Sequence, residues 1–293
     1  MPAPEGPLFD RALRRRRRRA RRAHRPDADY LRAETERRLL DRLADTSRRF
    51  TDILIIGDPA NRVRDAVAGR YTDARITVLD ELQVTLSGDL RAPPFAANSF
   101  DAVLSLLDLH AIDDLPGALA QSRTMLRPDG LFLAAFPGGE TLGELRYALM
   151  QAELERRGGA TARIVPLVDI RDAGALLQRA GFALPVADTD RLDLTYAHLL
   201  DLIADLRAIG ETNPLMRSSR SPLDRTIFLR TAEIYAETFA DPRGRIRATF
   251  DLLFMTGWKP DPSQPRPLAP GSARSRLADA LDPTKPPGDQ KPR

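Results

Sequence analysis

The stretch Ile53-Leu54-Ile55-Ile56-Gly57 is a continuous apolar run that ends in a glycine. Such a run is typical of a strand that is buried on both faces of a parallel sheet. Strand patterns recur further along the chain, with helical spacing between them: the strands at 76–79, 84–87, 102–107 and 131–136, the helices at 61–69 and 115–126. This alternation predicts a doubly wound α/β sheet with helices on both faces.

The segments around this alternation have other patterns. Residues 8–49 are expected to be helical, and a second helical stretch, residues 192–240, interrupts the alternation. Residues 248–256 return to a strand pattern, and we expect this last strand to join the same sheet antiparallel to its neighbour. The chain is therefore expected to divide into a basic N-terminal arm with helices (1–50), a sheet domain with a helical insert (51–258, insert 192–240) and an extended Pro-rich tail (259–293).

Composition excludes several kinds of chemistry. The chain of 293 residues has no cysteine, which rules out disulfides, thiolate zinc sites, cysteine-held iron–sulfur clusters and a cysteine nucleophile. Its three histidines are widely separated, and its apolar runs fall far short of the ~18 residues of a membrane span. No apolar stretch follows the N-terminal arginines, so a secretory signal is not expected. We expect a bacterial cytoplasmic protein, or a mitochondrial matrix protein if the source is eukaryotic.

The positive charge is concentrated at the N-terminus. Residues 1–25 hold ten arginines against Glu5 and Asp10, a net charge of +8, whereas the whole chain carries only +4. The remainder is therefore mildly acidic, at −4. One interpretation of the Arg14–Arg19 run is a solvated helix face or flexible arm, and another is binding to nucleic acid or an acidic partner. We predict that residues 1–25 serve association rather than folding, with nucleic acid the less favoured partner because no aromatic side chain interleaves the arginines.

Ligands of doubly wound sheets bind beyond the carboxyl ends of the strands. Three places qualify in this sequence: the turn that starts at Gly57 and Asp58, the carboxylate of Asp80, and the segment Ser87-Gly88-Asp89-Leu90. Asp80 could accept both hydroxyls of a ribose, and Asp89 could receive the exocyclic amine of an adenine. Each aspartate could equally be a turn or cap residue.

A set of motifs then resembles a known family. They include Asn98-Ser99-Phe100-Asp101, Leu126-Arg127-Pro128-Asp129-Gly130, Phe9-Asp10-Arg11-Ala12-Leu13 and Gly138-Gly139-Glu140-Thr141-Leu142. The chain is similar to class I S-adenosylmethionine-dependent methyltransferases, in the malonyl-carrier-protein methyltransferase-like group and the branch of complex I assembly factors that hydroxylate a protein arginine. The resemblance implies a Rossmann-like sheet, S-adenosylmethionine as cofactor, and cofactor contacts from Gly57, Asp58, Asp80, Asp89 and Leu90.

The sequence departs from that family at the cofactor turn. Ile55 stands at the family's acidic position, and Pro59 and Asn61 replace its second and third glycines. Proline adds bulk and has no N–H, so the turn is expected to bind S-adenosylmethionine weakly or not at all. The short spacing after Asp80 also leaves too few residues for a crossover helix, and the family's third strand is expected to be displaced or absent.

Residues that contact the substrate are expected at the end of the fourth strand and in the insert. His110 follows that strand, although a histidine packed in a loop is the simpler interpretation. The insert 192–240 would lie above the cofactor cleft as a lid, with Asn213 and Met216 facing the cleft. The alternative is that its helices only cap the sheet.

Three functional hypotheses follow. The first is an S-adenosylmethionine-dependent methyltransferase, or arginine modifier, acting on a protein or carrier-protein-bound substrate. The second is a non-catalytic relative that assists respiratory-complex assembly by binding a protein. The third is a nucleic-acid binder that uses the arginine arm alone. No catalytic residue can be nominated from spacing, and no metal site is expected.

Overall fold

The computed structural model describes residues 7–22, 30–58, 60–80, 90, 93–210, 212–216 and 223–265. The chain divides into a unit from Met1 to Pro260 and a second unit from Asp261 to Arg293. In the second unit, the carboxylate of Asp261 accepts hydrogen bonds from the backbone and hydroxyl of Ser263, which closes a short turn.

A six-stranded sheet forms the centre of the first unit, in the order β2-β1-β3-β4-β6-β5. Strands β1 to β4 pair in parallel, and β6 is antiparallel to both β4 and β5. The predicted doubly wound sheet with an antiparallel last strand is therefore confirmed. The strands are β1 Asp52–Ile56, β2 Arg75–Leu79, β3 Phe100–Leu106, β4 Leu126–Gly138, β5 Ala183–Tyr196 and β6 Ile246–Trp258.

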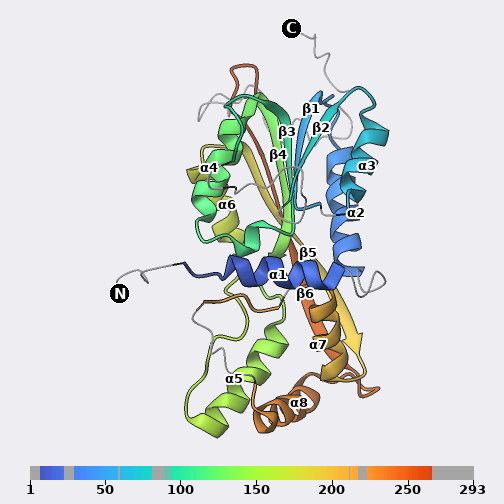
Figure 1. Cartoon of the computed structure of the whole chain (residues 1–293), viewed down its shortest axis with the longest axis vertical. Helices are drawn as coiled ribbons and strands as arrows, with labels where there is room; N and C mark the ends of the chain where they lie inside the picture. The colour runs from blue at the N-terminus through green and yellow to red at the C-terminus, as the bar shows by residue number, and fades with distance from the viewer. Residues whose placement is uncertain are drawn as a thin grey trace, which may run out of the picture. The chain divides into compact units, whose positions relative to one another are not determined.

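Helices cover both faces of the sheet (Figure 1). Side chains of α2 and α3 pack with Ile53 and Ile55 on one face, and those of α4 and α6 pack with Leu54 and Ile56 on the other. This two-sided burial explains why the first strand is apolar at every position from 53 to 56. The helices are α1 Arg11–Arg22, α2 Tyr30–Ala44, α3 Arg62–Arg70, α4 Leu115–Met125, α5 Gly143–Arg157, α6 Ile170–Arg179, α7 Leu199–Ala208 and α8 Arg225–Phe239, with a 3-10 turn η2 at Leu109–Ala111.

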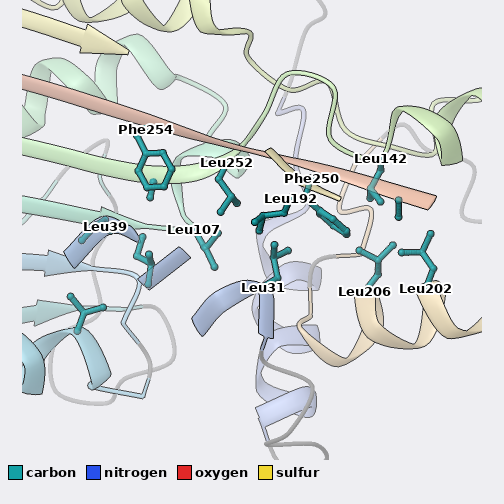
Figure 2. Close-up of a cluster of buried hydrophobic side chains, with 14 of the residues drawn as sticks. Leu31, Leu39, Leu107, Leu142, Leu192, Leu202, Leu206, Phe250, Leu252 and Phe254 are labelled. Carbon is teal, nitrogen blue, oxygen red and sulfur yellow. The ribbon is translucent and has the colours of Figure 1, made fainter. Parts of the chain in front are cut away.

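The long strands β5 and β6 extend past the carboxyl ends of the central strands. Residues 190–196 of β5 still pair with 246–252 of β6 there, and helices α5, α7 and α8 lie around this extension (Figure 1). The insert predicted as helical from residue 192 therefore begins as strand. The first five residues of the insert, 192–196, continue strand β5. The reason is that Leu192 packs in the same hydrophobic core as Phe250 and Leu252 of β6 (Figure 2).

Smaller corrections concern the ends of elements. The helical pattern expected over residues 8–49 corresponds to two helices in the described part of the chain, α1 and α2. Asp169 caps the N-terminus of α6, because its side chain accepts the backbone N–H of Asp172. The motif at 126–130 lies inside β4, where the register shifts opposite Phe100 and Asp129 has a positive φ of 61°. The candidate strand at 84–87 lies outside the described residues.

The N-terminal arm packs against the rest of the unit. Phe9 is buried and forms an antiparallel bridge with Leu215, while Asp113 accepts the backbone N–H groups of Leu8 and Phe9. From there α1 crosses beside the carboxyl ends of the central strands (Figure 1). Arg14 and Arg18 are only 5% and 4% exposed. The prediction that the arm serves association rather than folding is therefore wrong for its described part, and the arginines still exposed are Arg11, Arg15, Arg16 and Arg19.

Candidate functional site at the strand ends

The turn after β1 brings the backbone of Gly57 close to the neighbouring strand β3. Gly57 has a φ of +82°, and a Cβ built there would lie 2.1 Å from the carbonyl oxygen of Leu106. Glycine is thus needed by the turn itself. Asn61 has a φ of 59°, in the left-handed region that asparagine tolerates. Pro59 lies outside the described residues.

The neighbouring carboxylate holds the start of α3. Asp58 is buried, and its Oδ2 accepts the backbone N–H of Arg64 at 2.8 Å. This bond satisfies one of the unpaired donors at the N-terminus of that helix. Asp58 therefore shapes the turn from within.

Three buried arginines cap three adjacent strand ends. Arg18 pairs with Asp80 after β2 at 3.7 Å, and both side chains are almost completely buried. Arg32 of α2 donates to the carbonyl of Gly57 after β1 at 3.1 Å. Arg14 donates to the carbonyl of Leu107 at 2.9 Å and contacts Asp108, both after β3. These arginines thus occupy the sheet edge where the sequence places the cofactor.

No local pattern in the sequence reveals this arginine cluster. Arg14 and Arg18 are one helical turn apart, so they share a face of α1. That spacing is hidden inside an unbroken run of arginines, which has no period of its own. The available signal was the pair of aspartates, Asp80 and Asp108, that follow buried strands and need positive partners.

The carboxylate of Asp80 suits the ribose of a nucleoside cofactor, but the described conformation leaves little space for such a ligand. Asp80 is the type of carboxylate that accepts ribose hydroxyls, and Leu90 is buried beside it. The cleft that Gly57, Asp80, Leu90, Arg14 and Asp108 line has a volume of only about 30 Å³. Ligand pockets of small molecules start near ~300 Å³. A nucleoside therefore fits Asp80 only if α1 moves away. Asp89 lies outside the described residues.

A much larger cavity lies next to this cleft. Its volume is about 1010 Å³, and it is enclosed by α1, α2, η2, α5, α7, the segment 163–167 and the loop after α7. Its apolar wall includes Leu31, Leu107, Leu142, Leu206 and Phe250, which Figure 2 shows gathered from five different segments. Of the predicted substrate contacts, His110 and Asn213 line this cavity.

Met216 does not face the cavity, contrary to the sequence prediction. It is absent from the described lining residues and its side chain is 37% exposed, whereas Leu215 is buried and lines the cavity. The reason is the bridge between Phe9 and Leu215, because side chains alternate along an extended strand. Asn213 has a structural role as well: its side chain donates to the carbonyl of Ala162 and accepts the N–H of Leu215.

An ion pair fixes one rim of the cavity. Asp251 accepts the backbone N–H of Glu140 at 3.1 Å and pairs with Arg191 at 2.8 Å, while its own N–H bonds the hydroxyl of Thr141. Burial alone would raise the pKa of Asp251, but Arg191 and the Glu140 N–H outweigh it and lower that pKa. The motif Gly138–Leu142 is thus held in place at the cavity wall, through partners that no local pattern revealed.

The described residues contain no group of three or more side chains that could hold a metal ion. Within the same residues, every helix is too short or too polar to span a bilayer.

Similarity to known proteins assigns this fold to a class of proteins. A family model for a methyltransferase domain matches residues 40–134. A candidate methyltransferase from Bacillus halodurans C-125 has the same fold, with a TM-score of 0.50 at 14% identity over 77% of this chain and 99% of that one. The fold and the strand-end turn thus define a class I methyltransferase-fold protein.

Sequence relatives narrow the class to a family. The chain is 37% identical to the mitochondrial arginine-hydroxylase NDUFAF5 of Danio rerio, over 93% of this chain and 89% of the relative. It is 36% identical to the human protein of that name, over 91% and 81%. The malonyl-(acyl-carrier protein) O-methyltransferase of Xylella fastidiosa matches at 33% identity, over 86% and 89%. The chain belongs to the methyltransferase-fold family that contains these NDUFAF5 proteins.

Proposed function

We propose that the chain is an S-adenosylmethionine-dependent transferase that acts on a protein or a carrier-protein-bound substrate. The observation that carries the proposal is the adjacency of two features: the Gly57 turn with the buried carboxylate of Asp80, and the cavity of about 1010 Å³ beside them. The names of the relatives support a protein or carrier-bound substrate. A bacterial cytoplasmic location, or the mitochondrial matrix in a eukaryote, belongs to the same proposal.

In this proposal the cofactor supplies an electrophilic methyl group when it is bound. Asp80 would hold the ribose hydroxyls, with Asp58 and Leu90 shaping the pocket and Asp89 toward the adenine. The rest of the catalytic effect is positioning, since methyl transfer needs a nucleophile that is oriented rather than strongly activated. His110 lines the cavity from the 3-10 turn after β3, two positions after Asp108. It is a titratable side chain that could orient the nucleophile of the substrate.

A second function is favoured by the Arg18–Asp80 pair. A non-catalytic assembly factor has no need of a ribose acceptor, and here the acceptor is covered by an arginine of its own chain. In that case the buried pair is a permanent part of the fold, and the chain acts by binding a respiratory-complex subunit or another protein.

Calorimetric titration with S-adenosylhomocysteine separates the two functions. We compare the full chain with the variant Arg18→Met, the double variant Arg18→Met/Asp80→Asn, and, as a control, Asp73→Asn, which changes an exposed aspartate at the opposite end of β2. The transferase proposal predicts weak binding by the parent chain, at least tenfold tighter binding by Arg18→Met, and no binding by the double variant. Asp73→Asn should match the parent.

The double variant leaves no unpaired buried charge, so it is the better-folded test of Asp80. Absence of binding by both the parent chain and Arg18→Met at millimolar ligand, with melting temperatures showing that both are folded, would contradict the transferase proposal. That result would leave the assembly-factor function.

A further inference from the structure

Helix α5 carries large apolar side chains on the face that it turns to solvent. Tyr147, Met150 and Leu154 are 42%, 41% and 42% exposed. Their spacing of three and four positions places them on one face of the helix, opposite the buried Ala148 and Ala152. We call these three side chains the α5 stripe.

The α5 stripe is not needed to attach α5 to the rest of the protein. The other face of the helix already joins the hydrophobic core through Leu145 and Leu149, and no residue of the stripe belongs to that core. In Figure 1, α5 lies on the outer side of the extension that β5 and β6 form. The stripe is therefore an apolar surface beyond what the fold itself requires.

One member of the stripe is held in a fixed position. The ring of Tyr147 contacts that of Phe239 in α8 edge to face, with the ring centroids 5.7 Å apart. An aromatic side chain that is already oriented loses little conformational freedom when it is buried in an interface. Tyrosines of this kind are enriched at the contacts that carry most of the binding energy.

The spacing of the stripe matches the seam of a two-stranded coiled coil. Residues 147, 150 and 154 follow the a, d, a order of a heptad, in which each apolar side chain inserts between side chains of the facing helix. A helix with the same spacing complements such a stripe. A second copy of this chain supplies that helix, because a twofold interface presents the same surface on both sides.

The charges beside the stripe differ between its two sides. At about 100° per residue, Arg146 and Arg157 fall on one side of the stripe and Glu155 falls on the other. Neither Arg146 nor Arg157 has an ion-pair partner within the described part of the chain. On the second side, Arg230 of α8 lies within 4 Å of three carboxylates, those of Glu155, Glu233 and Glu237. One side therefore carries surplus positive charge and the other surplus negative charge.

These charges select the orientation of the second copy. Around a twofold axis, two antiparallel helices bring equal sides together, so Arg146 and Arg157 of both copies would face one another. Two parallel helices bring unlike sides together, so the arginines of one copy meet the carboxylates of the other on both sides of the seam. The parallel arrangement is therefore favoured.

We propose that α5 pairs in parallel with α5 of a second copy of this chain, through Tyr147, Met150 and Leu154. The inference goes beyond the proposed function and does not depend on it. A helix of 15 residues is about 22 Å long, so the contact is small. Small interfaces are weak, and we expect a dimer with a dissociation constant on the order of 10 µM.

Sedimentation equilibrium of the full chain over a wide range of concentrations tests the proposal. We expect a monomer–dimer equilibrium. Met150→Glu/Leu154→Glu should weaken the dimer at least about tenfold, because it places like charges from both copies in the seam. The matched control Val186→Glu/Leu200→Glu changes exposed apolar side chains of β5 and α7, and should dimerise like the parent.

Introduced thiols test the orientation, since the chain has no cysteine of its own. In a parallel pair each residue meets its own copy, so Met150→Cys should form a disulfide-linked dimer under mild oxidation and Leu200→Cys should not. An equal mixture of Tyr147→Cys and Leu154→Cys chains should form disulfide-linked homodimers only. In an antiparallel pair these two positions would face each other and give the mixed dimer.

Two results would overturn the dimer: a monomer at every concentration, or a dimer that Met150→Glu/Leu154→Glu does not weaken. A mixed disulfide between the Tyr147→Cys and Leu154→Cys chains would overturn the parallel arrangement. The substituted side chains are exposed, and melting temperatures verify that each variant is folded. Titration with S-adenosylhomocysteine is a separate measurement, so none of these results bears on the transferase proposal.

Discussion

The backbone at Gly57 gives a sharp prediction for single residues. An alanine there would place its Cβ 2.1 Å from the Leu106 carbonyl at a φ that L-residues rarely adopt. We expect Gly57→Ala to lower the free energy of unfolding by about 3 kcal/mol or more. Gly69, inside α3, has no atom within 4 Å of the corresponding position. Gly69→Ala should therefore raise stability by about 0.5–1 kcal/mol.

Urea denaturation followed by circular dichroism measures both variants. A Gly57→Ala protein as stable as the parent would mean that the backbone of Gly57 does not pack as closely against the Leu106 carbonyl as the structure shows. The opposite signs expected at the two glycines make the pair its own control.

At the scale of one element, α1 is predicted to be part of the fold. Removal of residues 1–22 uncovers the apolar surface against which Phe9 packs and takes away Arg18, the ion-pair partner of Asp80. Burial of apolar side chains is the main stabilising contribution to a fold, so its loss is destabilising. We therefore expect a large fall in melting temperature, measured by calorimetry, together with release of the loop that Phe9 bridges at Leu215.

The control for this deletion is a change in charge without loss of packing. Arg15→Gln/Arg19→Gln removes two exposed guanidinium groups from the same helix. Its stability should stay within about 0.5 kcal/mol of the parent. A deletion variant that melts like the parent would restore the interpretation of α1 as a separate arm.

The contrast between α1 and β1 shows what sequence patterns can predict. Ile53–Ile56 predicts a strand correctly, because burial on both faces leaves a local signature in every residue. The role of Arg14 and Arg18 depends on Asp108 and Asp80, which lie 94 and 62 positions away in the chain. Pairings across such distances leave no period, so a run of arginines looks the same whether it is solvated or buried.

Site residues follow the same rule. The placement of Gly57, Asp58 and Asp80 at one edge of the sheet could be predicted, because they follow strands whose carboxyl ends meet there, and their contact with a cofactor stays a prediction. The outward side chain of Met216 was not, because a bridge to Phe9 sets its direction. The large cavity needs five segments to come together, and no single stretch of sequence carries that information (Figure 2).

For the whole molecule, paired carboxylates predict how stability depends on pH. Burial alone would raise the pKa of Asp101, but hydrogen bonds from Thr51, Arg127 and two backbone N–H groups lower it to about 2. Hydrogen bonds from Arg37 and Arg38 lower the pKa of Glu34 to about 2. In the unfolded chain such groups titrate near 4. The folded protein therefore binds fewer protons, and its stability is complete above about pH 5 and is lost as the pH falls from about 4 to 2.

Melting temperatures recorded between pH 7 and pH 2 check this expectation. The curve should be flat from pH 7 to about pH 5 and should fall steeply below pH 4. Asp101→Asn should reduce the steepness, because it removes one of the carboxylates that must be protonated, and the exposed Asp73→Asn should not. A melting temperature that stays constant down to pH 2 would show that these ion pairs contribute little.

The bridge between Phe9 and Leu215 has a consequence for the order in which the protein is made. Synthesis runs from the N-terminus at roughly 5–20 residues per second, so the partner of Phe9 emerges about 10–40 s after it. Partners for the rest of α1 emerge much earlier, because Asp80, Asp108 and Asp113 all precede Leu215 in the chain. The bridge to Leu215 is therefore the last of these contacts to form on the nascent chain, after α1 already has its other partners at the strand ends.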